Sequence, residues 1–170
     1  MGDIKIGKGS ISIFSLIACV GALLAFIAFF LSITKFGADT VLFGKQWTDG
    51  ISGIDFLNNT YDGHKVDDVY TFWKIMPLLT MLTGLATIVL GILPIFGVKN
   101  NGIQIAFMVC GILTFVFGLL VFICTAGTAV LDTTADKSDI LVKRQIGAYF
   151  ALLGGLIAGG CAVADKFVKL

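Results

Sequence analysis

The chain has 170 residues, of which 57% are hydrophobic and 14% are charged, and all of its acidic residues are aspartates. A soluble domain carries about 25% charged residues, so this composition excludes an ordinary water-soluble globular protein. The formal net charge of +1 is too small to indicate binding to nucleic acid.

Four long uncharged runs follow one another along the chain. Roughly 20 mostly apolar residues cross a hydrocarbon core of about 30 Å, and such a segment must be helical because lipid cannot bond to open backbone groups. The runs are apolar on every side, whereas helices of a soluble protein keep a polar face. We therefore predict an all-α membrane protein, a four-transmembrane-helix bundle made of a single domain over residues 1–170, with spans at about 11–34, 75–98, 103–131 and 146–165.

The third run is long for a membrane crossing. Residues 103–131, if helical throughout, would form a helix about 44 Å long. Such a helix either tilts or projects beyond the bilayer, unless Ala126-Gly127-Thr128 interrupts it.

The connections are unequal, and this bears on orientation. Residues 35–74 and 132–145 form long loops on one face, while the tight turn at 97–102 and both tails lie on the other. The face with the long loops carries more Lys and Arg in total. The face with the tight turn and the two tails has fewer of them, but they occur within fewer residues and so at higher density. That density, together with the glycosylation sequon at Asn58, favours a multi-pass protein of the plasma or cell membrane with both termini cytoplasmic and both long loops outside.

The first loop has a folded composition. Asp49-Gly50 separates strand-forming residues around Trp47 from a second apolar run, Ile51 to Leu57, which is a hairpin signal. We predict a small β-element in this extracellular loop, lying over the outer ends of the helices. Its candidate contact residues are Trp47, Ile51, Ile54 and Phe56.

The same loop contains half of a calcium-binding pattern. Residues 58–63 match the first half of the motif, but Val69 stands where a bidentate glutamate is required. Asp62, Asp67 and Asp68 are therefore either metal ligands or solvated turn residues, and the incomplete motif favours solvated residues. We predict no metal site.

Chemistry inside the membrane requires ionisable groups at depth, and the interiors of the four predicted spans contain none. The only histidine, His64, lies in a loop and cannot supply a pair of haem ligands. We predict that the protein is not an enzyme and binds no cofactor.

The fourth span has small residues in rows at helical spacing. Such rows allow helix backbones to approach closely. Either all of them pack inside the chain's own bundle, or one row forms a seam for a second copy or another membrane protein. The candidate interface residues are Gly147, Ala151, Gly154, Gly155, Ala158 and Gly159.

The layout resembles the claudin-type family of four-span proteins: a short start, a long first outer loop with a tryptophan (Trp47), a tight second loop, a long third span and small residues in the fourth. The resemblance implies a left-handed four-helix bundle beneath a small extracellular sheet. The Gly-Leu-Trp triplet and the paired loop cysteines of that family do not occur in residues 35–74.

These features predict a non-enzymatic structural or assembly protein that self-associates or docks partners through its outer loops and small-residue helix faces. One alternative is an accessory or regulatory subunit of a larger membrane transporter, channel or enzyme complex. A third is an oligomeric pore, whose only candidate lining is Thr80, Thr83, Thr87 and Gln104.

Overall fold

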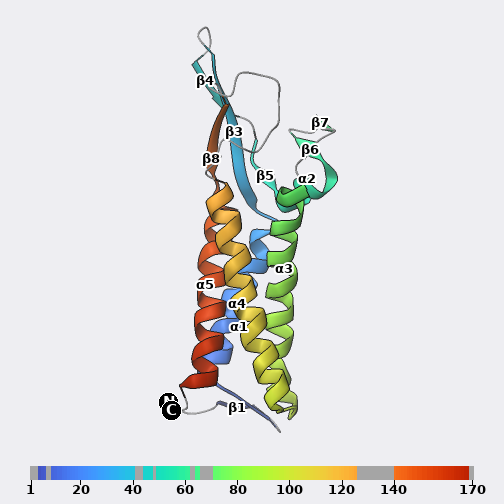
Figure 1. Cartoon of the computed structure of the whole chain (residues 1–170), viewed down its shortest axis with the longest axis vertical. Helices are drawn as coiled ribbons and strands as arrows, with labels where there is room; N and C mark the ends of the chain where they lie inside the picture. The colour runs from blue at the N-terminus through green and yellow to red at the C-terminus, as the bar shows by residue number, and fades with distance from the viewer. Residues whose placement is uncertain are drawn as a thin grey trace.

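The computed structural model describes residues 4–6, 9–40, 44–47, 49–61, 64–65, 71–125 and 140–168. Four apolar helices lie side by side, and a small β-sheet extends beyond one end of them (Figure 1). The C-terminal end of the last helix and a hairpin of two short strands lie at the opposite end. The four helices are α1 (Ile13–Ala28), α3 (Thr71–Ile92), α4 (Asn101–Cys124) and α5 (Ile146–Phe167), and a 3-10 helix, η1 (Leu93–Phe96), follows α3.

The sheet is built around β3 (Ser32–Thr40). On one side β3 pairs antiparallel with β8 (Ile140–Arg144), and on the other it pairs with β4 (Gly44–Trp47) and β5 (Ile51–Ser52). A short helix, α2 (Gly53–Asn58), follows β5, and we refer to this sheet together with α2 as the cap. Two separate hairpins pair β1 (Ile4–Ile6) with β2 (Gly9–Ile11) and β6 (Thr60–Tyr61) with β7 (His64–Lys65).

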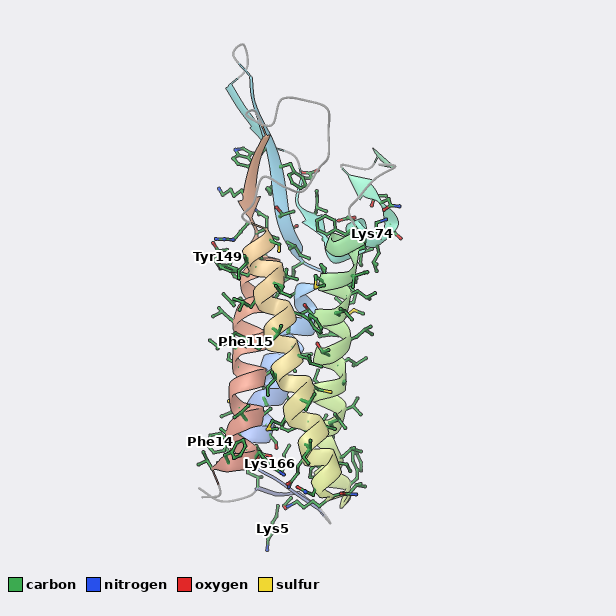
Figure 2. The ribbon with its side chains drawn as sticks, viewed as in Figure 1. Lys5, Phe14, Lys74, Phe115, Tyr149 and Lys166 are labelled. Carbon is green, nitrogen blue, oxygen red and sulfur yellow. The ribbon has the colours of Figure 1, made fainter. Side chains whose placement is uncertain are left out.

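The bundle has small side chains inside and large apolar side chains outside. Each helix packs mainly against two neighbours, in the order α1, α5, α4, α3. The inward faces carry alanine, glycine and threonine, and the residues with no exposed surface include Ala18, Ala22, Thr87, Thr114 and Ala158. Large apolar side chains project outward from the bundle (Figure 2). They occur on all four helices and include Val20, Leu82, Ile123 and Leu153, each about half exposed. A water-soluble bundle has the opposite arrangement, with its large apolar residues in the core.

Three of the predicted spans correspond to helices long and apolar enough to cross a membrane: α3 with η1, α4, and α5. The first predicted span, at about 11–34, is not helical throughout. Helix α1 has 16 residues and ends at Ala28, and residues 32–34 belong to β3. The residues around Phe29 and Phe30 are apolar, and a buried strand is as hydrophobic as a buried helix. Hydrophobicity alone therefore does not show where the helix ends.

The third span differs from its prediction as well. Helix α4 ends at Cys124, where the N–H of Thr125 donates to the carbonyl of Val121 at 3.1 Å. Residues 126–131, over which the prediction continued the helix, lie outside the described residues.

The predicted β-element is present, but its hairpin is placed differently. The strand β4 pairs antiparallel with β3 and not with the residues after Asp49-Gly50, and the run from Ile51 to Leu57 is mostly the helix α2 rather than a strand. A capping box begins this helix: the N–H of Asp55 donates to Ser52 Oγ at 3.3 Å, and the N–H of Ser52 donates to Asp55 Oδ2 at 2.8 Å. Asn59 ends it in the left-handed conformation (φ 53°). Residues 41–43 and Thr48 lie outside the described part of the chain.

Candidate functional site

One apolar cluster joins the cap to the bundle. It runs from helix residues into cap residues without a break: Ala28, Ile33, Phe36, Ile51, Phe56, Val121, Ala148 and Ala151. Ile51 and Phe56 are 4% and 3% exposed, so these two predicted contact residues hold the cap onto the helices and are not available to a partner. The other two, Trp47 and Ile54, are exposed.

The backbone connections at this junction are short. Helix α1 leads into β3, and β8 leads into α5 through the single residue Gln145, whose N–H donates to the carbonyl of Ile33 at 3.0 Å. The N–H of Gly53 donates to the carbonyl of Phe29 at 2.9 Å, and a side chain at Gly53 would collide with the Phe29 ring. Hydrogen bonds and packing therefore hold the cap on the bundle both at the start of α5 and at the start of α2.

The small-residue rows of α5 lie inside the chain's own bundle. A Cβ built at Gly154 would lie 2.6 Å from the carbonyl oxygen of Gly21 on α1, and one at Gly155 would lie 2.8 Å from that of Thr114 on α4. Gly159 faces α4 in the same way, while Gly147 faces the end of α1. All six predicted interface residues of α5 are buried: Gly147, Ala151, Gly154, Gly155, Ala158 and Gly159. The contacts are those of the first alternative, packing within one bundle, and a second chain cannot reach these rows without separating the helices.

The threonines of α3 have hydrogen-bond partners within the helices. The hydroxyls of Thr80, Thr83 and Thr87 each donate to the carbonyl four residues earlier, at 2.8–2.9 Å. Thr87 also approaches the hydroxyl of Thr114 on α4 at 3.4 Å. The cavity beside Thr80 has a volume of about 10 Å³, enough for one water molecule at most. The hydroxyls of Thr80 and Thr83 are therefore bonded within α3, and that of Thr87 also contacts α4.

A larger cavity lies at the end of the bundle opposite the cap. Its volume is about 240 Å³, and its polar lining includes Ser10, Ser12, Ser15, Lys99, Gln104, Asp165 and Lys166. Ser12, the N-cap of α1, donates a hydrogen bond to Asp165 near the end of α5. Lys99 Nζ donates to Ser10 Oγ at 2.8 Å. The polar groups tie the ends of α1 and α5 together and connect the β1–β2 hairpin to the turn after α3. From the sequence, Asp165 could be located only at the end of a span. Its contact with Ser12 was not predictable, because the two residues are far apart in the sequence and no local pattern links them.

The remaining predicted sites have the following positions. Asn58 is exposed at the last turn of α2, so the sequon is sterically accessible, and its glycosylation stays a prediction. Asp62, Asp67 and Asp68 lie outside the described residues. Elsewhere in the described ranges, no three His, Cys or Asp side chains come close enough to hold a metal ion.

Four packed apolar helices with a small sheet beyond one end are present in the structure (Figure 1), and the resemblance to claudin-type proteins stays a prediction. That resemblance rests on the order of the elements. Comparison of the chain with protein-family models, with curated proteins and with solved structures found no match.

Proposed function

We propose that this chain is an integral membrane protein of the structural type, which holds a folded cap at the membrane surface as a docking surface for further copies or for another membrane protein. The observation that supports this most directly is the single buried cluster joining cap and bundle. A surface that is already ordered before binding loses less conformational entropy when a partner docks. A flexible loop would not need Ile51 and Phe56 buried in the bundle's core.

The membrane location is supported by the distribution of side chains. Large apolar residues cover the outside of the helices, while small residues and threonines fill the inside. Helices in lipid associate through small residues because lipid chains are as apolar as leucine, so burying large apolar side chains offers no advantage. In water the same exterior would be a continuous apolar surface, far larger than soluble monomers expose.

Helix α1 raises a question of length. Its 16 residues extend about 24 Å, which is less than the roughly 30 Å of hydrocarbon. The first residues of β3 complete the crossing: Ile33, Thr34 and Phe36 are at most 3% exposed. Non-helical backbone at membrane depth is tolerated where protein surrounds it, so the short helix is compatible with four crossings.

The outward face of α2 is the part of the cap that we assign to docking. Ile54 and Leu57 are 39% and 40% exposed, and residues three apart lie on the same face of a helix. The core of a protein interface is more apolar than the rest of the surface, and this pair could form such a core.

The test is the mass of the protein purified in a mild detergent, with and without the double change Ile54→Ser and Leu57→Ser. We expect the wild type to run as a complex and the double variant to run as single chains. Asn58→Ala, on the same helix and exposed, is the matched control and is expected to leave the complex intact. A foreign chain retained by the wild type supports the accessory-subunit function. A wild type that is monomeric and without any bound chain contradicts docking, and failure to float with liposomes contradicts the membrane location.

A further inference from the structure

A basic hollow lies where the sheet meets the first turn of α5. Its volume is about 600 Å³, and its lining includes Lys35, Trp47, Lys143, Arg144 and Tyr149. Lys35 on β3 stands directly opposite Lys143 on β8, and Trp47 on β4 stands opposite Gly37. Successive strand residues point to opposite faces, and Phe36 is buried in the cluster beneath the cap. Lys35, Lys143 and Trp47 therefore share the outer face of the sheet.

The two lysines form an unfavourable pair in the chain alone. Like charges directly opposite one another on neighbouring strands destabilise a sheet. Arg144 also lines the hollow, but it follows Lys143 along β8 and its side chain leaves the sheet on the opposite face. There its Nε donates to the carbonyl of Phe122 at 3.1 Å, and the guanidinium lies 4.2 Å from the centre of the Phe122 ring. These contacts hold the Arg144 guanidinium in place, and its other N–H groups do not take part in the hydrogen bond to Phe122.

Helix α5 begins at the same place. Its N-cap, Gln145, makes no capping hydrogen bond through its side chain, and the first turn has no acidic residue. The N-terminus of a helix carries a partial positive charge and free N–H groups, which attract anions. Two lysines and an uncapped helix start thus border one hollow, with Arg144 at its rim, and an anion bound there would offset the repulsion between the lysines.

Apolar and aromatic groups border the hollow on the side of the helices. Lys143 Nζ lies 5.8 Å from the centre of the Trp47 ring. Below it, Ile146, Tyr149 and Leu153 are each about half exposed, and their spacing places them along one outward stripe of α5. Figure 2 shows Tyr149 at the outer edge of the bundle, just below the sheet. Aromatic rings of this kind favour the level of the lipid headgroups.

We propose that this hollow binds the phosphate group of an anionic phospholipid, with the acyl chains along the Ile146–Tyr149–Leu153 stripe. The lysines contact the phosphate oxygens, Arg144 lines the rim, and the start of α5 faces the bound charge. The proposal rests on the membrane location proposed above and does not depend on docking by the cap.

The test compares lipid retention by the wild type and by the double change Lys35→Gln and Lys143→Gln. Each protein is equilibrated with mixed micelles of phosphatidylglycerol and phosphatidylcholine, and bound lipids are counted by native mass spectrometry. Each lysine near a charged lipid surface contributes about fivefold to binding, so we expect the double variant to lose about 25-fold of the preference for phosphatidylglycerol. Lys74→Gln is the matched control, because Lys74 lies at the same end of the bundle, at the start of α3 (Figure 2).

The outcomes separate the possible sources of the phosphate. Inorganic phosphate that displaces phosphatidylglycerol at equal concentration assigns the hollow to a free anion and overturns the lipid proposal. An equal loss in Lys74→Gln, or no loss in the double variant, overturns it as well. If the double variant does not fold, Lys143→Gln alone is the test, with an expected fivefold loss. A variant that still floats with phosphatidylcholine liposomes shows that the membrane location stands whatever happens to this site.

Discussion

The seam between α4 and α5 gives the sharpest test of the bundle. We consider the change Gly155→Ala. The added Cβ would lie 2.8 Å from the carbonyl oxygen of Thr114 and 2.9 Å from the Cα of Phe115, both backbone atoms of α4. Neither atom can rotate away, so the two helices must move apart.

The size of the effect follows from two opposing contributions. Overpacking of this kind costs about 1–3 kcal/mol, while replacing glycine by alanine within a helix contributes about 1 kcal/mol of stability. Gly160→Ala is the matched control: a Cβ there meets nothing within 4 Å, so only the helix preference remains. The helix preference cancels between the two variants, and Gly155→Ala is expected to be less stable than Gly160→Ala by about 1–3 kcal/mol.

The assay is equilibrium unfolding in mixed detergent micelles, followed by circular dichroism at several protein concentrations. Because Gly155 is packed within one chain, we expect the difference between the two variants to be independent of concentration. Equal stability of the two variants refutes the close α4–α5 contact. A difference that disappears on dilution shows instead that the seam lies between copies, because a contact between copies is lost when the chains separate.

Two smaller predictions concern individual hydrogen bonds. A double-mutant cycle of Thr87→Val and Thr114→Val, measured by the same unfolding assay, is expected to give a coupling of about 0.6 kcal/mol, because the two hydroxyls lie 3.4 Å apart; zero coupling contradicts that contact. Ser52→Ala removes the N-cap of α2 and is expected to cost about 1 kcal/mol. Hydrogen exchange is expected to accelerate in α2 and to remain unchanged in α4, and uniform acceleration contradicts a local role for this cap.

The existence of the helices was predictable, but their ends were not. Long uncharged apolar runs indicate helices whatever their neighbours are. At the end of α1, however, Phe29, Phe30 and Ile33 are equally apolar in a helix or a strand. The change from helix to strand depends on β3 pairing with β8, more than a hundred residues later. By contrast, α2 could have been recognised, because Ser52 followed three residues later by Asp55 is a capping signal.

The rows of small residues on α5 were visible in the sequence, but their partners were not. The presence of small residues on adjacent faces suggested a surplus, on the assumption that one neighbouring helix uses one row. In the ring formed by the four helices, α5 has two neighbours, α1 and α4. Gly154 faces the first and Gly155 faces the second, so both rows are needed inside the bundle.

The cap gives a physical reason for the row that faces α1. Helices α1 and α5 continue into paired strands, and paired strands lie about 4.8 Å apart, whereas packed helices lie about 8–10 Å apart. The two segments must therefore converge as they approach the sheet, and bulky side chains would prevent this. Gly147 is located at that point: a Cβ there would lie 2.8 Å from the carbonyl oxygen of Ser32 and 3.0 Å from that of Ala28. The small residues between α1 and α5 thus allow the sheet to form directly on the bundle, and the junction they create is where Lys35 and Lys143 meet.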